Sequence, residues 1–340
     1  EFGLMKKILK GIEVDKKLEL FLMATGMHLM DEFGHTISEV DKEFRVEIIE
    51  AIFNKDGRES MARFLGKCSL GVTEALIKEK PDMVMVLGDR AEQLAIAQAA
   101  AYLNIPLVHL HGGEETRTID NKARNAISQL ADWHLPATKK AKKRLMNMGI
   151  DKKTIKVVGA PGLDEIKELE GVEKKYQLVV LQHPDEDELE SGEQIKETLK
   201  AAVSFDLPIH VIFPNADAGG RKMIKVINDF KKQCPKQITI YKSLERGKFL
   251  KMLAKSRVLI GNSSSGLIET PSLGLAVVNI GPRQTRRERG SNIIDVDYKE
   301  QEIKKAIEKA MKMTGDKFKN PYGDGKTSKR VIKFLKTKVL

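Results

Sequence analysis

The chain has little cysteine. Its 340 residues include only Cys68 and Cys234, with no pair at CxxC spacing. A disulfide framework and a cysteine-rich metal site are therefore excluded, and the composition predicts a reduced, cytoplasmic protein. No apolar run approaches the roughly 20 residues that span a bilayer, so we expect no membrane partner. No signal peptide is evident, although the first residue is Glu1 rather than Met, and we expect the native product to include residues upstream of it.

Aromatic residues are also scarce, at 5% of the chain, which is poor material for stacking nucleic-acid bases. The 59 Lys and Arg against 48 Asp and Glu give a net charge of +11. This charge permits anionic partners of several kinds and selects none of them. Most lysines fall on polar helix faces, as in 139–144, which indicates solvated surface. A nucleic-acid binder is the class least favoured, and we expect no nucleic-acid partner.

Apolar runs of strand length alternate with amphipathic helical stretches through the first half of the chain. Leu4, Ile8, Leu9 and Ile12 fall on one helical face. The pattern predicts strands at 18–24, 82–87, 107–110 and 155–158, and helices at 91–103 and 119–130. The run at 82–87 is continuously apolar, which is typical of a strand buried on both faces.

The same alternation restarts after a polar stretch at 168–175, which predicts a linker. Strands are predicted at 178–182, 209–213, 238–241, 258–260 and 276–280, with helices near 194–204, 220–231, 248–254 and 266–273. Two such series predict an α/β protein of two Rossmann-like, doubly wound parallel-sheet domains that face a cleft. We expect domains at 1–165 and 172–328, and a last helix at 329–340 that crosses back onto the first domain.

The beginning of the chain departs from this architecture, because it opens inside a predicted helix. Doubly wound sheets normally open with a strand, often a central one. We therefore expect the first strand of the first sheet to be missing. Its absence would leave a hole in that sheet and remove a loop that faces the cleft.

Acidic and basic residues follow the predicted strands of the first half, at the sheet edge where such folds bind ligands. Asp89 and Arg90 suit acid–base work and a bidentate contact to phosphate or carboxylate, or else a helix cap beside a surface arginine. Glu114 and Asp120 are candidate proton carriers, or acids of a solvated loop. Gly112-Gly113 between them indicates backbone that passes close to a ligand.

Histidines accompany these acids, since His109 and His111 share one face of the strand at 107–110. Histidines and carboxylates are metal ligands in other proteins, but we expect no metal here. A further histidine, His183, follows the strand at 178–182 and is held by Pro184. A single histidine of this kind is more often structural than catalytic.

The segment Gly261-Asn262-Ser263-Ser264-Ser265-Gly266 carries the strongest signal. A strand, a turn of small residues and a helix start make an anion site, because free N–H groups and hydroxyls favour phosphate. Glu269 lies on the predicted helix and suits a pair of sugar hydroxyls. An ordinary well-capped helix remains the alternative. Arg283 lies in a basic loop after the next strand and raises the local positive potential. Neither a Walker sequence nor GxGxxG is present.

These residues together are similar to the UDP-N-acetylglucosamine 2-epimerase family, in its hydrolysing branch. The segments that carry the resemblance span nearly the whole chain: 25–29, 88–90, 111–114 with 118–120, 182–184, 213–219, 261–269 and 279–284. The resemblance implies the two-domain architecture of the glycosyltransferase B type, with the active site between the domains. It implies no cofactor and no catalytic metal, and family members commonly form dimers or tetramers.

The resemblance also implies a reaction. A UDP-2-acetamido sugar would lose UDP together with the proton on carbon 2, and water would then add to give the free 2-epimer, such as N-acetylmannosamine. The implied catalytic residues are Asp89, Glu114, Asp120 and His183. The implied contacts to UDP or sugar are Arg90, His28, His111, Asn215, Ser263, Ser264, Glu269 and Arg283. The order of proton transfers is not assigned.

Some features depart from the family pattern and leave alternatives open. A Gly-Thr-Arg loop that usually supplies a substrate-binding arginine is absent, and His111 stands where many members of the sialic-acid pathway have Glu. Hydrolysing relatives that act on diacetamido-trideoxy sugars are similar at these positions, so the sequence does not choose between the two kinds of sugar. The alternatives are a non-hydrolysing 2-epimerase, a glycosyltransferase of the same architecture, and a sugar-nucleotide sensor without turnover.

Overall fold

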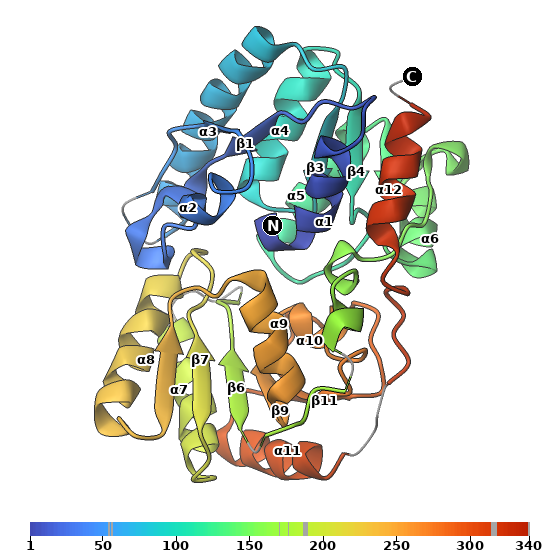
Figure 1. Cartoon of the computed structure of the whole chain (residues 1–340). Coiled ribbons are helices and arrows are strands. Elements are labelled where there is room, and N and C mark those ends of the chain that lie inside the picture. The colour runs from blue at the N-terminus through green and yellow to red at the C-terminus, as the bar shows by residue number, and fades with distance from the viewer. Residues whose placement is uncertain are drawn as a thin grey trace.

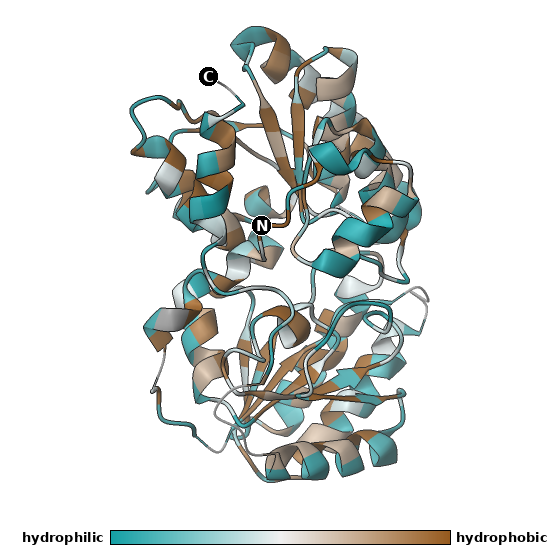
Figure 2. Ribbon diagram, turned by 90° about the vertical axis from the view of Figure 1, so that its right-hand side faces the viewer, coloured by the Kyte–Doolittle hydropathy of each residue, from teal (hydrophilic) through white to brown (hydrophobic). Residues whose placement is uncertain are grey.

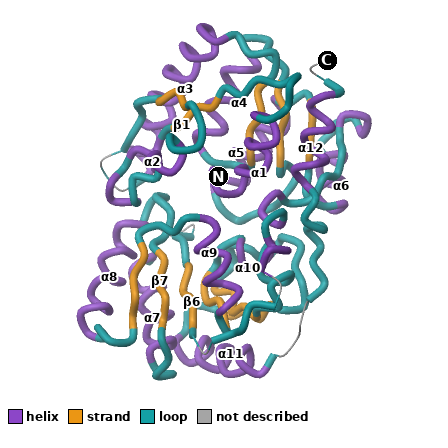
Figure 3. Tube along the Cα trace, viewed as in Figure 1, coloured by secondary structure: helices purple, strands orange, loops and turns teal. Residues whose placement is uncertain are grey.

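The computed structural model describes residues 1–338 except 54, 56, 170, 176, 186–189 and 314–317. Its strands fall into two groups, one formed by residues 22–135 and the other by residues 178–296, with helices around each (Figures 1 and 3). All strand pairs among the described residues are parallel. The prediction of an α/β fold with parallel sheets is therefore confirmed.

The helices are α1 Phe2–Glu13, α2 Ile37–Val40, α3 Arg58–Glu79, α4 Ala91–Tyr102, α5 Ile119–Leu130, α6 Lys139–Asn147, α7 Ser191–Val203, α8 Gly220–Gln233, α9 Arg246–Lys255, α10 Ser265–Ile268, α11 Glu300–Lys312 and α12 Thr327–Lys336. The strands are β1 Leu22–Ala24, β2 Val46–Ile48, β3 Val84–Leu87, β4 Leu107–Leu110, β5 Trp133–Leu135, β6 Leu178–Leu181, β7 Ile209–Ile212, β8 Ile238–Tyr241, β9 Val258–Gly261, β10 Ala276–Ile280 and β11 Ile293–Val296.

The second group is a single sheet of six described strands, in the order β11-β10-β9-β6-β7-β8. The first of these strands in the sequence, β6, is therefore central, and the chain winds outward from it in both directions. Strands β6 and β9 are buried along their whole length, because α7, α8 and α11 cover one face and α9 lies on the other. The apolar runs that predicted these strands form the brown interior of the lower half in Figure 2.

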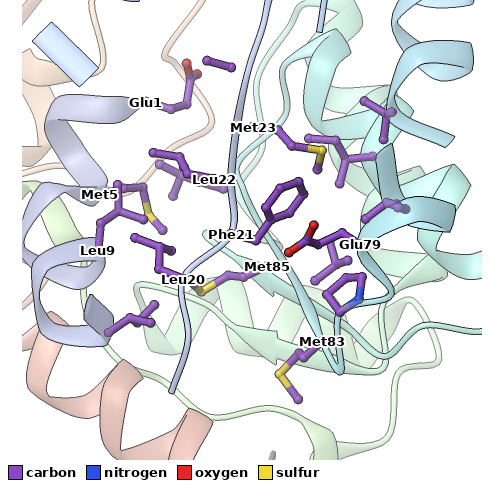
Figure 4. A pocket seen from close by; sticks show the side chains of 18 of the residues that line it. Glu1, Met5, Leu9, Leu20, Phe21, Leu22, Met23, Glu79, Met83 and Met85 are labelled. Atoms are coloured by element: carbon purple, nitrogen blue, oxygen red, sulfur yellow. The ribbon is translucent and has the colours of Figure 1, made fainter. Parts of the chain in front are cut away.

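The first group is divided into two separate sheets, β1-β2 and β3-β4-β5. A cavity of about 590 Å³ lies between β1 and β3, and apolar side chains from both strands and from the residues before them line it, including Leu20, Leu22, Met83 and Met85 (Figure 4). The strand order resembles that of the second sheet. The cavity has the two strands β1 and β2 on one side and the three strands β3, β4 and β5 on the other, as β6 has β7 and β8 on one side and β9, β10 and β11 on the other. The central position, which β6 fills in the second sheet, is held by this cavity.

The last helix, α12, lies against α1 and the first group of strands rather than against the sheet that precedes it in the sequence (Figure 1). Val331, Phe334 and Leu335 of α12 are buried with Ile8 and Leu9 of α1. The ring of Phe334 meets the edge of Trp133 at a centroid distance of 5.8 Å. The predicted helix at 329–340 begins and ends earlier, at 327–336, and residues 339–340 lie outside the described part.

Several predicted elements are wrong in extent. Residues 155–158 form one isolated bridge, between Ile155 and His134, instead of a strand. The strand expected at 18–24 covers only 22–24. The helix expected at 266–273 ends at Ile268. Thr270 precedes Pro271, and a residue before proline disfavours the helical conformation. No element was predicted for α3, β2, β5, β11 or α11.

Within the described ranges, no helix is both long and apolar enough to cross a membrane. The same residues contain no group of three or more His, Cys, Asp or Glu side chains placed to hold a metal ion.

Candidate functional site

A cavity of about 150 Å³ lies between the two groups of strands. It is bordered by the turns after β3, β4 and β9, and so by the carboxyl ends of parallel strands, where doubly wound sheets bind ligands. Its polar lining includes four carboxyl groups and two guanidinium groups. The residues are Glu1, Asp89, His111, Glu114, Arg124, Ser264, Ser265, Glu269 and Arg287.

Asp89 follows Gly88 at the end of β3 and forms an ion pair with Arg124 of α5. The Arg124 side chain is 4% exposed, so this pair is shielded from water. Arg124 also donates to the backbone carbonyl of Glu114 at 3.1 Å. One buried arginine thus fixes the positions of both the Asp89 carboxylate and the loop that carries Glu114.

Glu114 is buried in the loop after β4. Its Oε2 accepts a hydrogen bond from Nε of Arg287 at 2.8 Å, whereas its Oε1 is buried without a hydrogen-bond partner. Burial alone would raise the pKa of Glu114, but the charge of Arg287 outweighs it and holds the pKa below its usual value. The carboxylate is therefore ionised at neutral pH, with one oxygen available to a ligand.

His111 lies between β4 and Gly112, in the left-handed region with φ +67°. Its ring is parallel to that of Tyr322, at a centroid distance of 6.5 Å. Burial and the nearby Arg287 lower its pKa to about 4, so the ring is neutral at pH 7.

Ser264 and Glu269 border the cavity from the opposite side. The turn that carries them starts at Gly261, whose φ of +134° and close approach to the carbonyl of Leu181 leave no room for a Cβ. Glu269 is the C-cap residue of the four-residue α10 and does not lie on the first turns of a longer helix, as the sequence predicted. Its Oε1 accepts from Nη2 of Arg246 at 2.7 Å, and its Oε2 is buried without a partner.

A second cluster adjoins the cavity and joins the two groups of strands. Asp217 accepts from Nη1 of Arg90 at 2.7 Å and lies 3.6 Å from Nη2 of Arg283. The same Arg283 nitrogen is 3.4 Å from Asp120. Burial and the adjacent Asp217 raise the pKa of Asp120. Burial opposes ionisation of Asp217 as well, but Arg90 and Arg283 outweigh it and lower the pKa of Asp217. The two arginines predicted to bind phosphate are thus paired with carboxylates.

His183 lies beside this second cluster. Its Nδ1 accepts from the backbone N–H of Asn215 at 3.0 Å, and the Asn262 side chain bonds to both the N–H and the carbonyl of His183. Nδ1 is therefore unprotonated and the proton of the neutral ring is on Nε2. Burial and the charge of Arg283 lower the pKa of His183 to about 3. The ring can donate from Nε2 at neutral pH but cannot carry a positive charge.

The cavity brings together five of the residues predicted from sequence: Asp89, His111, Glu114, Ser264 and Glu269. The second cluster brings together Arg90, Asp120, His183, Asn215 and Arg283, since Asn215 Nδ2 donates to Asp217 at 2.6 Å. Ser263 lies in the turn between β9 and α10, residues 261–265, which we call the serine turn. Its hydroxyl is hydrogen-bonded to the hydroxyl and the backbone N–H of Ser265. His28 does not border the 150 Å³ cavity: its Nδ1 is 2.8 Å from the Thr36 hydroxyl, and it lines the cavity between β1 and β3 together with Arg90.

Three charged residues of the site were not singled out from the sequence: Arg124, Asp217 and Arg246. Arg124 has a local signal, because it falls on the buried face of α5 beside Ile127 and Ser128. A cation on a buried helix face requires a charged partner. Arg246 meets Glu269 only through the tertiary fold, and the sequence holds no comparable signal for it. Arg287 belongs to the basic loop after β10 that the sequence predicts to raise the positive potential, but its pairing with Glu114 was not predicted.

The ionised carboxylate of Glu114, with its buried free oxygen, can exchange a proton with a neutral, hydroxyl-rich ligand. The arginines and the serine turn can bind an anionic group. A ligand with a sugar-like part and a phosphate-like part matches both halves of this arrangement.

Comparisons with known proteins agree with this arrangement. A family model described as UDP-N-acetylglucosamine 2-epimerase matches residues 10–336. A UDP-N,N'-diacetylbacillosamine 2-epimerase (hydrolyzing) from Legionella pneumophila is 40% identical, over 99% of this chain and 93% of the relative. A GDP/UDP-N,N'-diacetylbacillosamine 2-epimerase (hydrolyzing) from Campylobacter jejuni is 31% identical, over 91% of this chain and 84% of the relative.

The fold is similar to solved structures. The crystal structure of Methanocaldococcus jannaschii UDP-GlcNAc 2-epimerase in complex with UDP-GlcNAc and UDP superposes with a TM-score of 0.83. The match covers 99% of this chain and 97% of that chain, at 21% identity. At this identity the likeness shows the fold alone, and it supports the predicted pair of Rossmann-like sheets.

Proposed function

Because the chain belongs to the UDP-N-acetylglucosamine 2-epimerase family and is an enzyme of its hydrolysing branch, we propose that it converts a UDP-2-acetamido sugar and water into UDP and the free 2-epimer. The observation that carries the proposal is the pair of carboxylates, Asp89 and Glu114, that face Ser264 and Glu269 across one shielded cavity. This pairing puts proton-transfer groups opposite the groups that suit a nucleotide diphosphate.

The first step is elimination. The proton on carbon 2 is not acidic, so a positioned carboxylate removes it while the bond between carbon 1 and the phosphate oxygen breaks. Glu114 is the better-placed acceptor, because its Oε1 has no protein partner and Arg287 keeps it ionised. Asp89 is engaged by Arg124 and is proposed to orient the sugar or carry the second proton.

The departing UDP gains negative charge as the bond breaks. Arg90 and Arg283 are proposed to neutralise this charge, with Nε2–H of His183 donating a further hydrogen bond. The serine turn is proposed to bind the diphosphate, and the free Oε2 of Glu269 to accept from the ribose hydroxyls. Asp120, whose pKa is raised, is proposed to supply a proton during water addition.

Two sugars are candidates for the substrate. One is UDP-N-acetylglucosamine, which would give N-acetylmannosamine for a sialic-acid type of pathway. The other is a UDP-2,4-diacetamido-trideoxy sugar, favoured because the relatives at 40% and 31% identity are named for UDP-N,N'-diacetylbacillosamine. Both carry the 2-acetamido group on which the proposal depends.

We also propose that the enzyme works in the cytoplasm and as a homo-oligomer, a dimer or tetramer. Free Cys68 and Cys234 support a reducing compartment. Exposed apolar side chains on α3, Leu70 and Ile77, support contacts between copies. Light scattering during gel filtration measures the number of chains directly.

The test is incubation of the protein with each candidate sugar in D₂O, with products followed by ¹H and ³¹P NMR. The proposal expects free UDP and a free 2-epimer carrying one deuterium on carbon 2. A UDP-linked epimer would instead identify the non-hydrolysing reaction. UDP binding without any product from either sugar would identify a sensor. Release of UDP only when an acceptor is added would identify a glycosyltransferase.

A further inference from the structure

His111 differs from every other histidine of the chain in its hydrogen bonds. In the described part of the chain, the other six each have at least one ring nitrogen paired: His28, His35, His109, His134, His183 and His210. No protein group pairs with either nitrogen of His111 among those residues, although the residue is only 9% exposed. Since the ring borders the 150 Å³ cavity, its nitrogens are available to a ligand.

The fold holds the His111 ring in this place at a conformational cost. A φ of +67° is unfavourable for a residue with a Cβ, by about 1–2 kcal/mol. The ring is nevertheless fixed, because it stacks on Tyr322, whose hydroxyl donates to the carbonyl of Glu288 at 2.8 Å. A strained, nearly buried polar side chain that no protein group satisfies is typical of a ligand contact.

The other polar groups around the cavity are charged or hydroxyl groups. The charged ones are the carboxyl groups of Glu1, Asp89, Glu114 and Glu269 and the guanidinium groups of Arg124 and Arg287, which are donors already paired with Asp89 and Glu114. His111 alone offers a neutral ring with one N–H donor and one acceptor. An amide group has the matching pair, a carbonyl acceptor and an N–H donor, whereas a sugar hydroxyl is served equally well by a carboxylate.

We propose that His111 recognises an acetamido substituent of the pyranose, by donating a ring N–H to its carbonyl oxygen. The inference rests on the proposed function and adds a specificity-determining residue to it. His111 would make the enzyme prefer UDP-acetamido sugars to UDP-sugars with a hydroxyl in the same position, while contributing nothing to binding of the UDP part.

The test compares His111→Phe with His111→Gln. Both variants are neutral and carry the same backbone strain. Phenylalanine keeps a ring to stack on Tyr322 but has no donor, whereas glutamine keeps an amide donor and acceptor. We measure kcat and KM with the UDP-acetamido sugar that the wild type turns over, and the inhibition constants of UDP and UDP-glucose against it.

We expect H111F to lower kcat/KM about 10- to 100-fold, the loss of one hydrogen bond to a buried carbonyl, mostly through a higher KM. H111Q should stay within about 5-fold of the wild type, and the inhibition constants of UDP and UDP-glucose should change less than about 3-fold in both variants. Unchanged kcat/KM in H111F overturns the proposal. Equally weaker binding of the UDP-acetamido sugar, UDP and UDP-glucose also overturns the proposal, because that result indicates a structural role for His111.

Failure of the proposed function is a separate outcome. If the wild type releases no UDP from either candidate sugar, calorimetric binding of UDP-N-acetylglucosamine and UDP-glucose replaces the kinetics. His111 recognition then still requires the wild type to bind the acetamido sugar more tightly, and H111F to lose that preference while H111Q keeps it. Equal affinities of the wild type for the two sugars would reject the role of His111.

Discussion

At the scale of single residues, Glu114 and Glu115 form a natural pair for testing proton transfer. Glu114 borders the cavity, whereas Glu115 pairs with Arg286 and Arg144 outside it. We expect Glu114→Gln to lower kcat about 10²- to 10⁴-fold, because an amide cannot accept the proton from carbon 2. Glu115→Gln should retain activity. Steady-state rates of UDP release measure both, and equal rates in the two variants would refute the role of Glu114.

His109 governs part of the acid sensitivity of the fold. Nε2 lies 2.8 Å from the Gly88 carbonyl and Nδ1 lies 3.0 Å from the Ser128 hydroxyl, and burial lowers the pKa of His109 to about 3. In the unfolded chain its pKa is roughly 6.5. The unfolded state therefore binds the extra proton between these values, and the stability that His109 contributes above pH 6.5 is lost as the pH falls.

The difference between the pKa of His109 in the folded and unfolded states predicts how steeply the free energy of unfolding changes with pH. We expect His109→Gln to lessen the fall in the free energy of unfolding between pH 6.5 and 4.5, by up to about 1.4 kcal/mol per pH unit. Urea unfolding of both proteins across that range measures it. Parallel pH profiles for the wild type and the variant would contradict the assignment.

At the scale of the structural elements, the serine turn depends on Gly261. A Cβ there would lie 2.1 Å from the carbonyl oxygen of Leu181, in the neighbouring strand. Gly149 has a similar positive φ of +87° but open space around it. We expect Gly149→Ala to cost only about 1 kcal/mol, and Gly261→Ala to cost more and to weaken UDP binding. Calorimetry measures UDP binding and urea unfolding measures the stability of the two variants. Equal losses in both variants would show that the close approach of Gly261 to β6 is unimportant.

The packing of α12 can be followed by fluorescence, because Trp133 is the only tryptophan and its ring meets Phe334. We expect Phe334→Ala to cost about 3–5 kcal/mol and to shift the emission of Trp133 to longer wavelength, as water reaches the ring. The exposed neighbour Lys333 provides the control, since Lys333→Ala should change neither the free energy of unfolding nor the emission of Trp133. An unshifted spectrum in the Phe334 variant would mean that α12 does not shield Trp133.

The strands of the second sheet were predictable because each is a short apolar run between turn residues. The long helix α3 was not predicted. Its buried residues Phe64, Cys68 and Val72 repeat every four positions, but exposed Leu70 and Ile77 blur the apolar face. The site residues that come directly after a predicted strand, such as Asp89 and Glu114, were predictable, because the carboxyl ends of parallel strands meet at one edge of the sheet. The Glu114–Arg287 pair joins positions far apart in the sequence and depends on how the two halves of the chain meet.

At the scale of the whole molecule, the cavity of about 150 Å³ is smaller than the 300–1,000 Å³ typical of small-molecule sites. We therefore expect a UDP-sugar to occupy more than this cavity, reaching the adjoining cluster around Arg90 and Arg283. The ion pairs Arg90–Asp217 and Arg283–Asp120 cross between them. A diphosphate has to displace these carboxylates from the arginines that are proposed to bind it.

This competition predicts an unusual mutant. We expect Asp217→Asn to bind UDP about 3- to 10-fold more tightly than the wild type, because Arg90 and Arg283 lose a competing charge. Isothermal titration calorimetry measures the affinity. Asp229→Asn on α8, where the side chain pairs with Lys232 on the surface, should leave the affinity for UDP unchanged. Weaker UDP binding by the Asp217 variant would indicate that Asp217 itself contacts the nucleotide.

The space between β1 and β3 has a consequence for how this polypeptide behaves in concentrated solution. Each of the two strands pairs on one side only among the described strands, so both edges present peptide groups to a cavity lined by apolar and charged side chains. An unpaired strand edge can take up a further extended strand through its free peptide groups. We therefore expect these two edges to be places where neighbouring molecules pair strands and aggregate.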